Sequence, residues 1–252
     1  IVPFRGRFKY RVHIRGKPWC DGLKLYGLAD SEAFLYSFWF CKNQESERST
    51  KTADIVIDFA KDLPKGKKYL IIADSYFGSL ATAEALSEMN LRFILARSKI
   101  RPYELFEGGL HRLVKPSNRG QTAFVSKDNM TAITVCDRKL VNFITNCSDE
   151  KLADCTSMNN KKNSTEIPKI LMHYRQRLGR IDNIDASLIR YIYPHRTSKR
   201  TLAFLRGMLK ITLHNTWRAV ESLHQKSYSL REVTEALIKS IGNSVCATKK
   251  KI

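Results

Sequence analysis

The stretch KKYLIIADSYFGSLATAEAL, residues 67 to 86, constrains the fold more than any other part of the sequence. Its apolar run, residues 70 to 73, is typical of a buried strand, and Ser79 is a suitable N-cap for the helix that the following residues predict. Asp74 stands between this strand and this helix. Because a buried charge is costly unless something compensates it, Asp74 indicates a functional acid within an α/β unit.

The residues around this stretch extend it into a larger α/β fold. Alternating apolar and charged residues over 8–14, followed by LKLYGLA and AFLYSFWF, predict a three-stranded antiparallel meander. A helix over about residues 55–63 precedes the strand YLIIAD, and the strand LRFILAR follows the helix capped by Ser79. We therefore expect the order β-β-β-α-β-α-β for residues 1–98.

The pattern changes in the rest of the chain. Residues 99–164 carry chain-breaking glycines and prolines, the strand-like runs TAFVSK, AITVCD and KLVNFITNC, and the linker-like SMNNKKNSTE, and they predict a separate β-rich insertion. Residues 165–252 predict helices, the last of which opens with the capping box Ser229-x-x-Glu232 and ends at Gly242. The long helix before it carries the stripe Leu202, Leu205, Leu209, Thr212, Thr216, Val220 and Leu223.

Two further acids lie on the helix predicted around residues 171–188. Asp182 and Asp185 are three residues apart on one helical surface, where they repel each other unless a cation lies between them. A solvated acidic patch balanced by nearby arginines is the alternative. Together with Asp74 at the end of a strand, however, the pair suggests the oxygen ligands of a two-metal phosphoryl-transfer site with Mg²⁺ or Mn²⁺.

The charge of the chain indicates a polyanionic partner. Lys and Arg number 44 against 24 Asp and Glu, a net charge of +20, and the basic residues recur along the whole length. Ribosomal or membrane-surface binding and a merely solvated basic surface are the alternatives. No apolar run approaches transmembrane length. Near the amino terminus, basic residues alternate with apolar ones and are candidates for contacts with phosphate groups: Arg5, Arg7, Lys9, Arg11 and Arg15.

Four blocks of sequence carry a family resemblance. PFRGRFKYRVHIRGKPWCDGLKLYGLADS, IADSYFGS, HYRQRLGRIDNIDASLIRY and TLHNTW, in this order, resemble the transposase domain of the piggyBac family, including its domesticated members, from Val2 to about Ile241. The resemblance implies a ribonuclease H-like α/β core with a mixed sheet flanked by helices and a β-rich insertion. It also implies three catalytic aspartates, Mg²⁺ or Mn²⁺, double-stranded DNA partners in the form of transposon ends and target, a homodimer and a nuclear location. With the amino-terminal basic residues, it makes candidate DNA contacts of Arg97, Lys99, Arg101, Arg196, Lys199 and Arg200.

The resemblance assigns roles to the three acids. Asp74 matches the family's second catalytic acid, Asp182 the third, and Asp185 the additional acid beside it. The family's first acid lies just before the segment that matches VPFRGR, and we expect it ahead of Ile1. We also expect Asp74, Asp182 and Asp185 to approach one another. Departures from the family pattern within the matching blocks are Arg180 in place of a glycine and Arg175 in place of an asparagine.

Three functions fit these features. The first is a cut-and-paste DNA transposase that uses metal-dependent phosphoryl transfer. The second is a domesticated or decayed copy that binds DNA without nuclease activity. The third is a basic RNA-associated structural protein, which predicts no metal affinity at Asp74 and Asp182.

Overall fold

A computed structural model describes residues 1–16, 20–41, 51–97, 118–147, 155–160, 163–190 and 197–249. The chain forms two compact units. Unit 1 consists of Ile1–Gln44 together with Arg180–Ile252, and unit 2 consists of Glu45–Gly179. These divisions differ from the predicted boundaries after residues 98 and 164.

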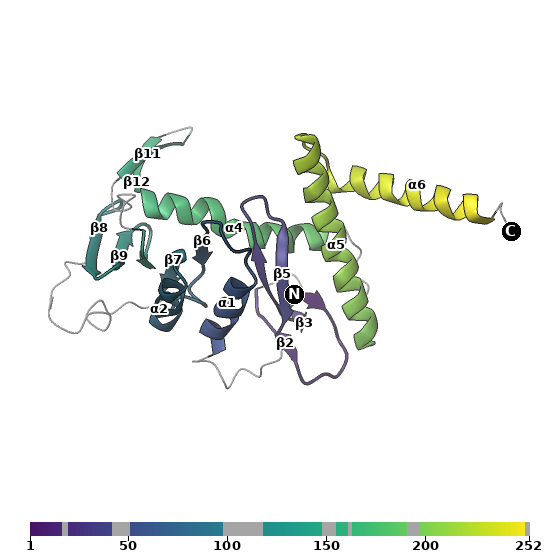
Figure 1. The fold of residues 1–252 in the computed structure, drawn as a ribbon, viewed down its shortest axis with the longest axis horizontal. Helices are drawn as coiled ribbons and strands as arrows, with labels where there is room; N and C mark the ends of the chain where they lie inside the picture. The colour runs from purple at the N-terminus through teal and green to yellow at the C-terminus, as the bar shows by residue number, and fades with distance from the viewer. Residues whose placement is uncertain are drawn as a thin grey trace. The chain divides into compact units, whose positions relative to one another are not determined.

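The centre of unit 2 is a five-stranded mixed sheet in the order β6-β7-β10-β9-β8. Figure 1 labels β6, β7, β8 and β9 of this sheet. Its strands are β6 (Leu70–Ala73), β7 (Arg92–Arg97), β8 (Thr122–Lys127), β9 (Met130–Cys136) and β10 (Leu140–Thr145). β6 is parallel to β7, with Ala73 opposite Leu95, and the other pairs are antiparallel. The sheet is therefore mixed, as the sequence predicts.

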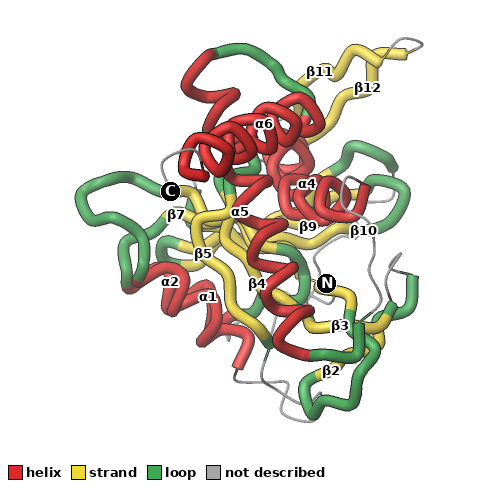
Figure 2. Tube along the Cα trace, turned by 90° about the vertical axis from the view of Figure 1, so that its right-hand side faces the viewer, coloured by secondary structure: helices red, strands yellow, loops and turns green. Residues whose placement is uncertain are grey.

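Helices cover both faces of this sheet. α1 (Lys51–Lys61) and α2 (Leu80–Glu88) run side by side and pack Val56 and Leu86 against β7 (Figure 2). The first part of α4 (Lys169–Arg190) packs Ile170 and Leu171 on the opposite face. Strand β7 is buried on both faces, which explains why LRFILAR reads as a continuous apolar run. The predicted cap is confirmed, because Ser79 Oγ accepts a hydrogen bond from the Thr82 N–H at 3.1 Å.

The expected separate lobe over residues 99–164 is wrong for residues 122–145. Strand β10 pairs with β7, with Thr145 opposite Ile94, so β8, β9 and β10 continue the main sheet. The reason is that the apolar β7 needs a partner on its second edge, and β10 supplies it. Asn146 extends this pairing by accepting from the Phe93 N–H at 2.9 Å and donating to the Leu91 carbonyl at 2.8 Å. Of the strands described within residues 99–168, β11 (Cys155–Asn160) and β12 (Asn163–Pro168) alone stay outside the main sheet and pair as a separate hairpin.

The strands of unit 1 are shorter than the sequence predicts. The strands β1 (Val2–Pro3), β3 (Asp21–Leu23) and β2 (Arg11–His13) form one antiparallel sheet, and β4 (Leu25–Ala29) pairs with β5 (Leu35–Phe40) in another. The predicted pairing of LKLYGLA with AFLYSFWF is confirmed. The single meander is not, because these two strands form a sheet separate from β1–β3.

The helices of unit 1 pack through small residues. In α5 (Arg200–His224) the buried face is formed by Ala203, Gly207, Ile211 and His214, whereas Leu205 and Leu209 of the predicted stripe are 55% and 60% exposed. A Cβ on Gly207 would lie 2.9 Å from a Val2 methyl group, so β1 approaches α5 where the helix has no side chain. A pattern of large apolar residues could not reveal this face.

The last helix is longer than predicted. In α6 (Leu230–Lys249) the capping box is confirmed, because the Ser229 N–H donates to Glu232 Oε2 at 2.7 Å and the Glu232 N–H donates to Ser229 Oγ at 3.2 Å. The helix continues past Gly242 instead of ending there. Within the described ranges, no helix is both long enough and apolar enough to cross a membrane.

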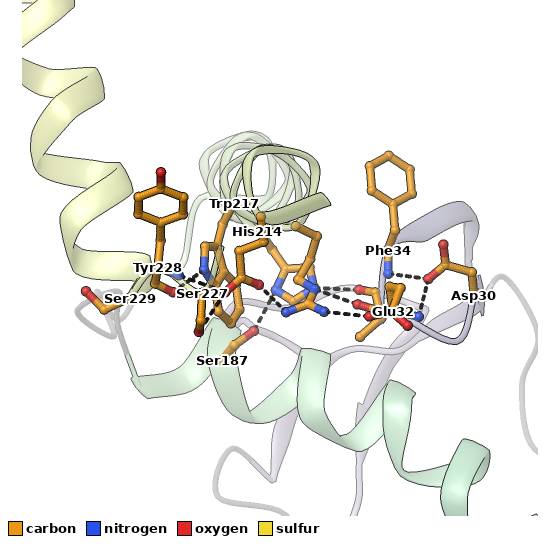
Figure 3. Close-up of polar contacts among 12 residues, drawn as sticks. Asp30, Glu32, Phe34, Ser187, His214, Trp217, Ser227, Tyr228 and Ser229 are labelled. Carbon is orange, nitrogen blue, oxygen red and sulfur yellow. Dashed lines mark hydrogen bonds and ion pairs between the residues drawn. The ribbon is translucent and has the colours of Figure 1, made fainter. Parts of the chain in front are cut away.

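A polar network on α5 ties together the parts of unit 1 (Figure 3). The buried His214 ring donates from Nε2 to the Ala33 carbonyl at 2.8 Å, and its Nδ1 lies 2.8 Å from Ser187 Oγ on α4. Asn215 binds both main-chain groups of Leu35, accepting from the N–H at 3.0 Å and donating to the carbonyl at 2.9 Å. Trp217 Nε1 donates to the Tyr228 carbonyl at 2.8 Å. The block TLHNTW therefore has a structural role in joining α5 to the β4–β5 turn, to α4 and to the segment before α6.

The turn that follows β6 should tolerate no side chain at Gly78. A Cβ there would lie 1.7 Å from the Ala96 carbonyl oxygen, so Gly78→Ala should lower the free energy of unfolding by about 3 kcal/mol. The matched control is Gly242→Ala, where an added methyl group meets no atom within 4 Å and should stabilise α6 by up to about 1 kcal/mol. Urea unfolding followed by circular dichroism measures both variants, and an equal effect at the two positions would contradict the packing of Gly78.

Unit 1 should lose stability when His214 is protonated. Burial lowers the pKa of His214 below 6.5, Arg218 lowers it further, and the hydrogen bond to Ala33 opposes both effects. The unfolded chain therefore binds a proton more readily, and the free energy of unfolding should fall as the pH drops below about 6.5, by at most about 1.4 kcal/mol for each pH unit.

This pH dependence can be assigned by variants. Denaturation at pH 7.5 and at pH 5.5 should show a smaller loss for His214→Gln, which keeps a donor and an acceptor but does not titrate. Val233→Ala, which truncates a buried side chain of α6, should be less stable by a similar amount at both pH values. If His214→Gln retains the full pH dependence, another group is responsible for it.

Candidate functional site

Asp74 lies directly after β6, as predicted, in a tight turn. Its Oδ1 accepts the Tyr76 N–H at 3.0 Å, and its carbonyl oxygen accepts the N–H groups of Phe77 and Gly78 at 3.2 and 3.1 Å. The close approach of Gly78 to β7 allows this turn. The Asp74 side chain is exposed and not buried, so the turn presents an accessible carboxylate at a fixed position.

Tyr174 is a neighbour of Asp74 that no sequence pattern assigns to the site. It projects from α4 onto the sheet, where its ring meets Phe143 edge-on with centroids 5.0 Å apart. Burial raises the pKa of Tyr174 to about 12, and the negative charge of Asp74 contributes to this shift. Tyr174 therefore stays a neutral phenol at physiological pH.

Arg175, which replaces the asparagine of the family pattern, contacts the sheet of the same unit. Its Nη2 lies 2.5 Å from Asp137 Oδ2, and Arg119 Nε lies 3.1 Å from Asp137 Oδ1. Burial alone would raise the pKa of Asp137, but the Arg138 N–H and the charges of Arg175 and Arg119 lower it overall. These contacts fasten α4 to the β9–β10 turn, so Arg175 has a structural role here.

Asp182 and Asp185 lie on the part of α4 that belongs to unit 1. Asp182 is exposed, and Asp185 is 21% exposed, with its Oδ1 at 3.2 Å from the main-chain nitrogen of Ile1. Next to them, Arg180 has a buried Nε atom for which the described part of the chain provides no hydrogen-bond partner. The helix turns its Ile184 and Ser187 side chains into the core, so both acids remain on its outer side.

The expected meeting of the three acids stays a prediction. Asp74 belongs to unit 2, whereas Asp182 and Asp185 belong to unit 1. Over the described ranges, no three His, Cys, Asp or Glu side chains gather closely enough to hold a metal ion. The chemistry of the donors nevertheless fits a hard cation, because all three are accessible or partly accessible carboxylates.

The predicted basic strand near the amino terminus is only partly regular. Strand β2 covers residues 11–13, and the residues before it form a loop and a turn. The alternation persists in the burial of the side chains, since Phe4 and Gly6 are buried. The basic residues of this segment, Arg5, Arg7, Lys9, Arg11 and Arg15, are all exposed.

Two basic segments that are distant in sequence lie together in unit 1. The Arg5 N–H donates to the Thr197 carbonyl at 3.3 Å, and a Cβ on Gly6 would lie 2.4 Å from the Ser198 carbonyl oxygen. The Arg200 guanidinium lies 4.9 Å from the centroid of the Phe8 ring. This close approach forms an exposed basic cluster, which we define as Arg5, Arg7, Lys199 and Arg200.

The remaining candidate DNA contacts are less informative. Arg97 is the last residue of β7 and is half-buried. Lys99, Arg101 and Arg196 lie outside the described residues. Charge is nonetheless unequal between the units, because unit 1 has 22 Lys and Arg against 8 Asp and Glu, and unit 2 has 22 against 16.

Comparison with known proteins agrees with the sequence resemblance. A family model described as Transposase IS4 matches residues 1–217. The chain is 21% identical over 253 residues to the human PiggyBac transposable element-derived protein 3, covering 94% of this chain and 42% of that protein. It is likewise 21% identical to the human Chimeric ERCC6-PGBD3 protein, covering 94% of this chain and 23% of that protein. It thus spans less than half the length of these relatives.

A solved structure shares the fold. It is the cryo-EM structure of a piggyBac transposase synaptic complex with hairpin DNA, with a TM-score of 0.74 and 22% identity, covering 100% of this chain and 52% of that chain. The fold is therefore ribonuclease H-like, as predicted. With a family match over residues 1–217, the chain belongs to the Transposase IS4 family, and its predicted resemblance to piggyBac transposases is confirmed.

Proposed function

We propose that this chain is the catalytic region of a piggyBac-like DNA transposase that cleaves and transfers DNA strands by metal-dependent phosphoryl transfer. The observation that carries the proposal is the exposed Asp74 carboxylate, fixed by a tight turn at the end of a strand, in a chain of a transposase family. Asp182 and Asp185 on α4 supply the further carboxylates.

The three acids would hold Mg²⁺ or Mn²⁺. Divalent ions held there would supply Lewis-acid chemistry for the attacking hydroxyl and for the leaving oxygen. The turn after β6 holds the Asp74 carboxylate in place through the Tyr76 N–H, and no rearrangement of the main chain is needed to present it. The basic residues of the chain position the phosphates and neutralise their charge.

The family's first catalytic aspartate should stand ahead of Ile1. Among the described strands, β6 pairs on one edge only, which leaves its other edge available to a further strand. The free edge of β6 favours an additional strand there, and the family resemblance puts the first acid on such a strand.

Double-stranded DNA is the proposed partner. Unit 1 has an excess of 14 basic over acidic residues, and its basic cluster is exposed at the start of α5. The solved relative is a complex with hairpin DNA, which makes transposon ends and target DNA the natural ligands. We further propose that the protein acts as a homodimer and in the nucleus, where such DNA is found.

The second candidate is a domesticated copy that binds DNA without cutting it. It is favoured by Arg180, which brings a bulky cation next to Asp182 where the family pattern has glycine. Such a protein would keep the basic cluster and would not need the acids. The RNA-associated alternative differs from both, because it requires no divalent-ion binding at Asp74 or Asp182.

Cleavage should depend on Asp74 and on the acid ahead of Ile1. We expect the present chain to bind a labelled duplex carrying the element's ends without cutting it. The chain extended upstream to include that acid should cut in Mg²⁺, and Asp74→Asn should abolish cutting while leaving binding nearly intact. An extended chain that binds but does not cut would favour the domesticated copy, and cleavage by the present chain would show that the missing acid is not required.

DNA binding should depend on the basic cluster more than on charge in general. In Arg5→Ala with Lys199→Ala, the slope of log K against log salt should fall by about 0.9 for each phosphate that the protein no longer neutralises. The charge-matched control is Lys65→Ala with Lys67→Ala, two exposed lysines of unit 2. Fluorescence anisotropy over a salt series measures both, and equal slopes for the two double variants would contradict a specific role for the cluster.

A further inference from the structure

His214 joins the acid-bearing part of α4 to the β4–β5 turn. One ring nitrogen donates to the Ala33 carbonyl and the other lies 2.8 Å from Ser187 Oγ, as Figure 3 shows for Ser187 and His214. The ring is 2% exposed and Ser187 is 8% exposed. Ser187 is two residues after Asp185 on the same helix, so this bridge acts on the turn of α4 that carries the acids.

Further hydrogen bonds hold the β4–β5 turn, to which His214 is bonded, in place. Asn215 binds both main-chain groups of Leu35, and Arg218 Nε donates to the Glu32 carbonyl at 2.5 Å. The turn itself is closed by Asp30, whose Oδ1 accepts from the N–H groups of Glu32 and Phe34 at 2.8 and 2.9 Å. Helix α5 is therefore hydrogen-bonded to the β4–β5 turn at several points, and His214 also connects it to α4.

The bridge sets the rotation of α4. At about 100° per residue, Asp185 lies about 100° and Asp182 about 160° around the helix from Ile184, on the same side. Ile184 and Ser187 face the core, and Lys210 Nζ donates to the Leu188 carbonyl at 3.4 Å. Apolar contacts are not directional and would let the helix shift along its axis or rotate about it. The contacts of His214 with Ser187 and of Lys210 with the Leu188 carbonyl are directional, so they fix both the axial position and the rotation of α4.

We propose that His214 is a positioning residue for the acid pair, holding α4 so that Asp182 and Asp185 face a divalent ion with the geometry that coordination needs. This inference rests on the proposed metal role of the two acids. Burying a histidine costs free energy compared with burying an apolar residue. The contacts of His214 with Ala33 and Ser187, which an apolar side chain cannot make, offset this cost. His214 touches no acid itself and acts through Ser187.

The test measures binding of Mn²⁺ to the full chain by water-proton relaxation, with the free energy of unfolding measured alongside. His214→Leu removes both hydrogen bonds and should weaken Mn²⁺ binding about tenfold. Ser187→Ala keeps the bond from His214 to Ala33 but removes the contact of His214 with α4, together with the hydrogen bond from Ser187 to the Ile184 carbonyl, and should weaken Mn²⁺ binding in the same direction. His214→Gln, which keeps a donor and an acceptor, should bind Mn²⁺ within about twofold of the original chain.

A stability control separates positioning from general damage. Val233→Ala truncates a buried side chain of α6 in the same unit without touching the bridge, and it should be less stable while binding Mn²⁺ normally. If His214→Leu and Ser187→Ala keep normal Mn²⁺ affinity, or if Val233→Ala loses as much affinity as they do, the positioning role is wrong. If the original chain binds no Mn²⁺, or Asp182→Asn and Asp185→Asn leave binding unchanged, the metal role of the acids fails, and the inference fails with it.

Discussion

The parallel pairing of β6 with β7 is the contact on which unit 2 depends. β7 is buried on both faces and paired on both edges, so each neighbouring element must fit it closely. The tightest fit is at Gly78, whose main chain passes against the Ala96 carbonyl. Because this contact fixes the turn after β6, it also fixes the direction in which Asp74 leaves the sheet. The contact between Gly78 and Ala96 therefore serves both the packing of the core and the placement of Asp74.

Unit 1 depends more on hydrogen bonds from side chains of α5. Its strands are short and its sheets small, so apolar burial alone holds the helices less firmly. Hydrogen bonds from about one turn of α5 contribute to this task, with His214, Asn215 and Trp217 each donating to a main-chain carbonyl.

The sequence predicts elements whose signals are local. The N-cap Ser79, the capping box of Ser229 and Glu232, and the strand ending in Asp74 depend on neighbouring residues, and the structure contains all of them. Predictions that require distant partners are less successful. Strand β10 resembles part of an insertion because nothing in its own residues shows that β7 needs a second partner. The buried face of α5 escapes prediction because Ala203 and Gly207 carry little hydrophobicity, although they allow the approach of Val2.

In the candidate site, too, features with a local sequence signal can be predicted and features that depend on distant residues cannot. Each acid can be found from its local pattern, because a carboxylate after an apolar strand and two carboxylates one helical turn apart are visible in the sequence. The basic cluster cannot, since it depends on the close approach of Gly6 to Ser198, which are 192 residues apart by their numbers. His214 is equally hidden, because a histidine on an apolar face is most often a core residue with satisfied hydrogen bonds. Ser187 connects it to the helix that carries Asp182 and Asp185, Ala33 connects it to the β4–β5 turn, and only the fold brings these residues together.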